Sequence, residues 1–265
     1  MKALARRIVF VVLIGALPAV GGCYSSIVSL TKCTAKYKSC ESVTHDFEPG
    51  SRLLVRSDFG PITISGGDVS ECQITGRVYV HAPTKQEAQE IGEQVQIVAE
   101  PNDGALLVTM TKPPLEEDRQ AWVDLSIVVP PAAHVDCETK FGRIRLTDIA
   151  GDVRAITQFG AITCDEMTSA NITAKSGFGS VYVTCGDACP ADLVADVRTD
   201  YGKIRFRAPE AFRGDFDVRT DFGSTRAKIP IASYDEWTGD HKVATTGSGN
   251  GKLSLQTEFG SVRLR

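Results

Sequence analysis

Two kinds of charged residue recur at fixed distances in the second half of the chain. Asp200 and Asp221 each precede an aromatic residue by one position, and Arg205 and Arg226 each follow the same aromatic residues by four. Polysaccharide lyases and hydrolases combine carboxylates with basic residues on one face of a β-helix, so an enzyme is one hypothesis. Ladders of solvated surface charge explain the same residues, and the motifs of other enzyme classes are absent. We therefore predict a non-enzymatic protein without catalytic residues.

The N-terminal residues predict export and a lipid anchor. A basic start precedes the apolar segment Ile8–Val20, whose 13 residues are too few for a comfortable transmembrane span. Small residues stand directly before Cys23, as in a bacterial lipobox. We predict a lipoprotein signal peptide over residues 1–22, lipidation of Cys23 and a tether over residues 23–42. The alternative is ordinary secretion with cleavage nearby.

The predicted location of the exported chain is the cell envelope. By resemblance to Gram-negative lipoproteins, Tyr24 in place of an aspartate after the cysteine favours the outer membrane if the host is Gram-negative. The chain of 265 residues has a formal net charge of −4, which is not typical of a general nucleic-acid binder. We expect contact with the membrane through the anchor, an envelope protein or a polysaccharide as partner, and no nucleic acid.

An exported protein meets an oxidising compartment, so its eight cysteines are candidates for disulfides. Without Cys23, an odd number remains, and at least one thiol is free or pairs between chains. Cys185 and Cys189 flank a short turn and are the first candidate disulfide. Cys33 and Cys40 are the second. The four histidines are scattered without ligand spacing to a cysteine, so we predict no metal site and no cofactor.

An aromatic residue followed by glycine occurs seven times in one frame. Ser or Thr stands two positions before each aromatic residue, and apolar residues alternate on both sides of it. The five central copies are separated by 18, 19, 23 and 21 residues. Such self-similarity predicts an all-β fold, a β-solenoid or β-helix-like stack of ~20-residue coils, each made of a strand, a glycine corner and a strand. The aromatic residues are Phe59, Phe141, Phe159, Phe178, Tyr201, Phe222 and Phe259.

The aromatic ladder has two interpretations. Buried as an internal stack, each Phe contributes about 1.5–3 kcal/mol, and this is the interpretation that we favour. Exposed in a groove, the same ladder stacks on sugar rings. Cys137 and Cys164 occupy inward positions of adjacent coils, where they either form a bridge or are buried as small apolar residues.

Basic residues recur four positions after the aromatic residue in several repeats. A stack of coils places them in one outward ladder, which is favoured to be an ordinary solvated face because water screens like charges. The alternative is a basic stripe that binds an anionic polymer. The residues of this candidate ligand surface are Arg145, Arg205, Arg226 and Arg263.

The repeats divide the exported chain into two parts. Residues 43–131 are predicted as an N-terminal β module that holds the isolated Phe59 repeat and a helix near residues 84–98, with the alternative that Gln94–Ala99 already forms strand. Thr84, with Glu87 three residues later, is the capping box of this helix. Residues 132–265 are predicted as the regular β-solenoid.

The C-terminal part of the repeat region carries two further predictions. The glycine-rich run Thr246–Lys252 is interpreted as one more coil without an aromatic corner. Arg263 and Arg265 are interpreted as charges that protect an exposed final strand from edge-to-edge association.

The order of a β module, Pro130-Pro131 and then Ser/Thr-x-x-Gly-x-Ile repeats resembles a bacterial adhesin-like family of unknown function. The corners Gly142-Arg143-Ile144-Arg145-Leu146 and Gly251-Lys252-Leu253-Ser254-Leu255 carry the resemblance, over about residues 45–265. It implies a β-solenoid and a role in the cell envelope, and it supplies no catalytic residues. The leading hypothesis is a lipid-anchored, non-enzymatic adhesion or scaffold surface. The alternatives are an envelope-stress sensor or partner-binding module, and a polysaccharide-binding or polysaccharide-degrading protein.

Overall fold

A computed structural model of the chain describes residues 35–265, all of which belong to one compact unit. This part is all-β with one helix, as the sequence predicts, and its strands form one mixed sheet of 19 strands. The predicted signal peptide, Cys23 and Cys33 lie outside the described residues. Within the described residues, no helix is long and apolar enough to cross a membrane.

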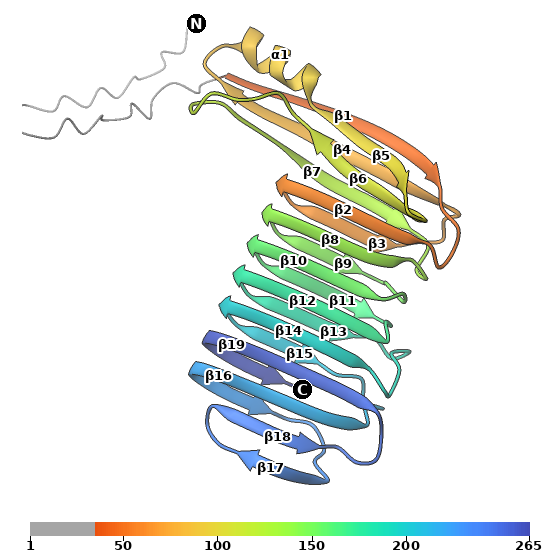
Figure 1. Cartoon of the computed structure of the whole chain (residues 1–265), viewed down its shortest axis with the longest axis vertical. Helices are drawn as coiled ribbons and strands as arrows, with labels where there is room; N and C mark the ends of the chain where they lie inside the picture. The colour runs from red at the N-terminus through yellow and green to blue at the C-terminus, as the bar shows by residue number, and fades with distance from the viewer. Residues whose placement is uncertain (1–34) are drawn as a thin grey trace, which may run out of the picture. The chain divides into compact units, whose positions relative to one another are not determined.

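The elements follow one another in chain order, and Figure 1 labels them. The N-terminal elements are β1 (Ala35–Asp46), β2 (Arg52–Phe59), β3 (Ile62–Gly66), β4 (Glu71–Ala82), α1 (Lys85–Gln94), β5 (Gln96–Asn102), β6 (Ala105–Thr111) and β7 (Gln120–Val129). The central strands are β8 (His134–Phe141), β9 (Ile144–Thr147), β10 (Val153–Phe159), β11 (Ile162–Met167), β12 (Asn171–Phe178), β13 (Val181–Cys185), β14 (Val194–Tyr201) and β15 (Ile204–Arg207). The C-terminal strands are β16 (Gly214–Ala227), β17 (Ser233–Trp237), β18 (His241–Thr245) and β19 (Gly251–Leu264).

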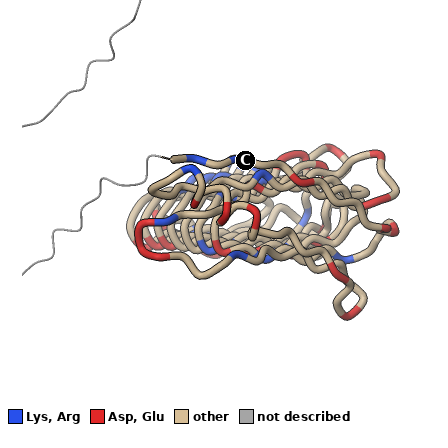
Figure 2. The backbone as a smooth tube through the Cα atoms, turned by 90° about the horizontal axis from the view of Figure 1, so that it is seen from above, with Lys and Arg blue, Asp and Glu red and all other residues tan. Residues whose placement is uncertain are grey.

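Each central repeat contributes one strand to each of two parallel ladders (Figure 1). The first ladder joins β2, β8, β10, β12 and β14, and the second joins β3, β9, β11, β13 and β15. Equivalent residues of successive repeats lie side by side, so that Ala155 pairs with Cys137 on one side and Ala174 on the other. Seen from above, the backbone follows a flattened closed outline (Figure 2).

The core lies between the two ladders because apolar side chains alternate along every strand. In β10, Val153 and Ala155 are buried and Arg154 is exposed; in β11, Ile162 and Cys164 are buried. A single repeat cannot bury its apolar face alone, and each neighbouring repeat extends the same core. Repetition of the sequence pattern therefore produces one continuous core.

A helix and five further strands close the N-terminal end of the ladders. β6 and β5 extend the first ladder beyond β2, and β7, β4 and β1 extend the second beyond β3. α1 packs on β1 and β4 and buries Ala88 and Ile91. The Phe59 repeat is not isolated, because β2 and β3 pair in register with β8 and β9 and form the first repeat of the two ladders.

Two boundaries differ from the predictions. Residues 35–42, predicted as tether, form the first part of β1, because each of them pairs in register with β4. The helix predicted over residues 84–98 has the expected cap, in which the Thr84 hydroxyl accepts a hydrogen bond from the Glu87 backbone N–H at 3.2 Å. It ends at Gln94, because the following residues pair antiparallel with β6 as β5.

The last strand of the chain lies inside the ladders rather than at their end. The first half of β19 pairs with β14 and its second half with β15, while its whole length pairs with β16 on the other side. Arg263 therefore lies between Arg205 and Arg226. The prediction that Arg263 and Arg265 protect an exposed edge strand is wrong, because β16 covers that edge.

The interruption between Phe222 and Phe259 is a hairpin rather than another coil. β17 and β18 pair antiparallel, and β18 pairs antiparallel with the first half of β16. A connection of three residues between β17 and β18 can join only antiparallel strands, because a parallel pair needs a long crossover. The glycine-rich run after β18 is the loop that returns the chain to β19.

The recurring Ser/Thr and Gly residues make the hydrogen bonds of the corners between the ladders. The glycine N–H donates to the aromatic residue's carbonyl in the next repeat, as from Gly160 to Phe178 at 2.9 Å. The Ser/Thr hydroxyl donates to the glycine carbonyl of the neighbouring repeat, as from Thr199 to Gly179 at 2.7 Å. The same hydroxyl bond is made by Thr157, Ser176, Thr220 and Thr257.

Glycine is required at these corners because successive corners almost touch. A Cβ on Gly160 would lie 2.0 Å from the carbonyl oxygen of Gly142, and one on Gly202 would lie 2.2 Å from that of Gly179. The obstacle in each case is backbone, which cannot move aside without breaking the ladder. Any side chain at this position would separate two repeats.

Gly160→Ala is expected to lower the free energy of unfolding by roughly 2–4 kcal/mol, because the new methyl group forces two corners apart. Gly239→Ala is the matched control, since no atom lies within 4 Å of a Cβ at that glycine. Urea unfolding followed by circular dichroism measures both variants. Equal stability of Gly160→Ala and Gly239→Ala would contradict this account of the corner.

Thr199→Val is expected to cost about 1–2 kcal/mol, because it leaves the Gly179 carbonyl without its hydroxyl donor. Thr139 occupies the same repeat position, but its buried hydroxyl has no hydrogen-bond partner. Thr139→Val should therefore leave stability unchanged or raise it slightly. Thermal unfolding of the two variants side by side provides the test, and a larger loss for Thr139→Val than for Thr199→Val would refute the assignment.

Candidate functional site

The seven repeat aromatics form an exposed ladder at the corner between the two strand ladders. Neighbouring rings lie face to face, with centroids 4.7–5.0 Å apart and interplanar angles of 1–7°. Their exposed fractions range from 41% for Phe59 to 65% for Phe222, so the favoured prediction of an internal stack is wrong. The alternation of the strand breaks at the corner: Thr157 points into the core, whereas both Gln158 and Phe159 are exposed.

The rings do not offer the sugar-stacking surface of the second interpretation either. Each central ring is covered on both faces by its neighbours, so only ring edges contact solvent. A sugar stacks on the face of an aromatic ring, and the only faces without a ring neighbour are those at the two ends. At one end the Lys112 ammonium lies 4.4 Å from the Phe59 centroid, while at the other Phe222 stacks only on Phe259. The ladder is an apolar strip roughly 30 Å long at the usual spacing of strands.

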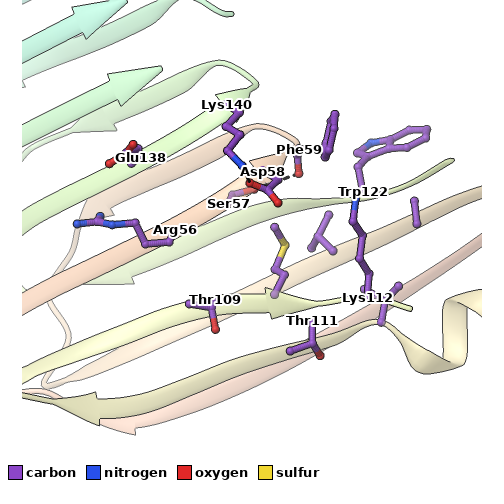
Figure 3. Close-up of a pocket in the computed structure, with 14 residues that line it drawn as sticks. Arg56, Ser57, Asp58, Phe59, Thr109, Thr111, Lys112, Trp122, Glu138 and Lys140 are labelled. Atoms are coloured by element: carbon purple, nitrogen blue, oxygen red, sulfur yellow. Dashed lines mark hydrogen bonds and ion pairs between the residues drawn. The ribbon is translucent and has the colours of Figure 1, made fainter. Parts of the chain in front are cut away.

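A pocket of about 670 Å³ opens beside the Phe59 end of the aromatic ladder (Figure 3). β6 pairs with β2 only as far as Val108 and Val55, and the two strands separate beyond that point. The pocket lies in the resulting wedge, with β7 contributing Trp122. Its apolar lining is Val95, Met110, Ala121 and Val123, and its charged lining is Arg56, Asp58, Lys112, Glu138 and Lys140.

The charges around this pocket are mostly paired. Lys140 Nζ lies 2.8 Å from Asp58, and Arg56 lies 3.0 Å from Asp136 (Figure 3 shows the first pair). Lys112 is different, since it contacts the Phe59 ring and also lines a second pocket of about 520 Å³, which is bordered by Phe59 and Phe141. This site was not predictable from the sequence, because it depends on where β6 separates from β2. The only feature of the sequence that could have indicated the pocket was the presence of two large side chains with polar ends, Lys112 and Trp122, in this part of the chain.

The outward face of the first strand ladder carries charges of both signs that neutralise one another. Arg154 lies 2.9 Å from Asp136, and Lys175 and Arg198 both contact Asp196, at 2.9 and 2.8 Å. These pairs are exposed, so each contributes at most about 1 kcal/mol. This face of the first ladder is an ordinary solvated surface.

The second strand ladder brings together three of the four arginines singled out in the sequence. Arg205, Arg263 and Arg226 lie side by side on β15, β19 and β16, and all are exposed. Arg145 lies apart on β9, where it contacts Asp165 at 3.7 Å. Asp200 and Asp221, the carboxylates of the enzyme hypothesis, belong to first-ladder strands and lie before the corner rather than beside the arginines.

The first predicted disulfide is not present in the structure. Cys185 and Cys189 are buried free thiols that hydrogen bond to each other, and Cys189 Sγ also lies 3.5 Å from the Ser169 carbonyl oxygen. Each thiol therefore has a hydrogen-bond partner without a covalent bond. Cys137 and Cys164 are also free and buried, as in the second of their two interpretations. Cys40 is exposed on β1, and its pairing with Cys33 stays a prediction.

The sequence matches no family model and no curated protein. Among solved structures, a candidate cell adhesion protein from Clostridium sporogenes ATCC 15579 has a TM-score of 0.45 at 10% identity, covering 85% of this chain and 99% of that one. A candidate adhesin from Bacteroides fragilis NCTC 9343 has a TM-score of 0.44 at 11% identity, over 86% and 97% of the two chains. A candidate adhesin from Parabacteroides distasonis ATCC 8503 has a TM-score of 0.26 at 11% identity, over 88% and 99%. Likenesses this distant carry no weight for the function of this chain.

Burial predicts which thiols react. Desolvation raises the pKa of both Cys72 and Cys164 to about 12, so almost no thiolate forms at pH 8, and neither side chain is accessible. Once a mild reductant has opened any bridge between Cys33 and Cys40, alkylation by iodoacetamide at that pH should modify exposed Cys40 in the folded protein, and Cys72 and Cys164 only after denaturation. Peptide mass spectrometry distinguishes the sites, and equally fast labelling of Cys72 and Cys40 in the folded state would contradict the structure.

Proposed function

We propose that the protein is a non-enzymatic adhesion or scaffold protein of the cell envelope, held there by lipid on Cys23. In this proposal the registered repeats are the coils of a β-solenoid, and their corner presents the aromatic ladder to another protein. The repeat architecture supports the proposal because solenoids generate long regular surfaces suited to extended partners.

The observation that carries this proposal is the exposed apolar strip that runs into two pockets. Soluble proteins rarely expose a contiguous apolar surface of this length unless it contacts a partner. The stacked rings are held by neighbours on both faces, so binding against their edges orders few additional side chains. The pocket of about 670 Å³ at the Phe59 end has an apolar floor, where a large side chain of an extended partner segment would be anchored.

The combined variant Phe159→Ser, Phe178→Ser and Tyr201→Ser should reduce attachment of the host cells to the level of cells that lack the protein, because it interrupts the apolar strip. The matched control changes outward residues on the same three strands, and consists of Ile156→Ser, Thr173→Ser and Val194→Ser. Attachment to surfaces and to neighbouring cells is counted after circular dichroism shows that both variants fold. Equal attachment by the two variants would contradict the proposal that the aromatic ladder mediates adhesion.

The anchor is tested in the same cells. Cys23→Ala should move the protein from the membrane fraction to the soluble fraction and reduce attachment. The aromatic ladder is unchanged in this variant. Continued fractionation of this variant with membranes would argue against lipid on Cys23.

A further inference from the structure

Six exposed cations form a grid on the second strand ladder, where β15, β19 and β16 lie side by side. Arg205, Arg263 and Arg226 form the first row, one residue on each strand. Two residues further along the same strands, Arg207, Arg265 and Lys228 form the second row, and backbone hydrogen bonds continue the ladder at that level. Neighbours within a row are about 4.8 Å apart, the spacing of paired strands. We call these six residues the basic grid.

The basic grid differs from the rest of the charged surface because its cations have no anionic partners. Within residues 35–265, no member of the grid forms an ion pair, whereas Arg154, Lys175 and Arg198 on the first ladder all do. Like charges directly opposite one another on paired strands destabilise a sheet. Repulsion within the grid therefore lowers the free energy of unfolding, and no ion pair of the grid offsets this loss within the described residues.

The grid offers directional hydrogen-bond donors as well as positive charge. Five of its six members are arginines, whose planar guanidinium group donates two parallel hydrogen bonds to one carboxylate. Arg205 lies over the Tyr182 ring, with its central guanidinium carbon 5.5 Å from the ring centroid, which limits the positions of that side chain. Ser261 and Ser224 lie side by side on the same strands, two residues before the first row, and bring hydroxyl groups to its border.

We propose that the basic grid binds a polyanionic glycan that carries carboxylates, such as a uronic acid polymer. The first row presents one arginine on each of three neighbouring strands. In an extended sugar chain with one carboxylate per ring, the spacing between successive carboxylates is comparable to the spacing between these strands. The bordering serine hydroxyls match sugar hydroxyls. The occupant's location in the cell envelope rests on the proposed function, but binding by the purified protein does not depend on it or on the aromatic strip.

Other polyanions fit the described surface less well. Single-stranded nucleic acid binds by stacking its bases on open aromatic faces, and the faces of the central rings beside this surface are closed by their neighbours. Binding to an anionic membrane combines positive charge with apolar side chains that enter the bilayer. Here serines border the first row, and the exposed aromatic ladder lies beyond them at the corner. Both polyanions are included in the test as competing occupants.

The test compares two charge-matched variants of the full chain carrying Cys23→Ala, using polygalacturonate as the probe. The grid variant is Arg205→Gln, Arg226→Gln and Arg263→Gln, and the control variant is Arg154→Gln, Lys175→Gln and Arg198→Gln on the first ladder. Titration calorimetry at low salt should show binding at least about tenfold weaker for the grid variant and within about twofold of the parent for the control. Neutral dextran should not bind, and added salt should weaken polygalacturonate binding.

Thermal unfolding of a single variant supplies a second readout. It keeps the proposal testable if the triple variant folds poorly. Arg263→Gln alone should raise the midpoint of unfolding at low salt, because it removes the central like charge, and should weaken polygalacturonate binding. The proposal is overturned if the parent does not bind polygalacturonate, or if grid and control variants lose affinity equally. It is also overturned if phosphatidylglycerol vesicles or single-stranded DNA bind the grid more tightly than polygalacturonate does.

Discussion

Contact between the backbones of successive corners sets the geometry of the surface in this protein. Because the corner glycines approach one another more closely than any side chain allows, each repeat lies directly on the next without a sideways shift. The Ser/Thr hydroxyls and glycine N–H groups then join neighbouring corners by hydrogen bonds. This register places equivalent residues of successive repeats next to one another. The stacked rings, whose centroids are 4.7–5.0 Å apart, and the rows of aligned charges both result from it.

The repeat made the strands and corners predictable, because alternation and the Ser/Thr-x-aromatic-Gly frame are local properties. Exposure of the rings was not predictable from their apolar character, since Phe159 lies where the alternation of β10 breaks. The position of β19 was not predictable either. All repeats share one pattern, so nothing local distinguishes Phe259 from Phe222 as the neighbour of Tyr201. The pocket at Trp122 depends on the separation of β6 from β2, which is a tertiary property.

One scaffold thus presents three surfaces with different physical character. The first ladder has charges that neutralise one another, and the corner has an apolar strip. Part of the second ladder has cations that form no ion pair within the described part of the chain. Arg145 shares its repeat position with the other three arginines, and a common surface was predicted for all four on that ground. Asp165 distinguishes Arg145 chemically, because it gives Arg145 an anionic neighbour. Within residues 35–265, no such neighbour pairs with Arg205, Arg226 or Arg263. Repeat position alone therefore does not define a binding surface; the neighbouring strands do.

The position of β19 also has a consequence for the order of events during folding. β16 and the β17–β18 hairpin precede β19 in the chain, yet they reach the central ladders only through it. The stack from β8 to β15 can assemble from contacts between successive repeats, but closing the C-terminal part requires a strand made later to insert between two made earlier. A chain that folds from its N-terminal end would have to hold β16 undocked, with its strand edge open, until β19 became available. That interval is when the chain is most exposed to aggregation and to proteolysis.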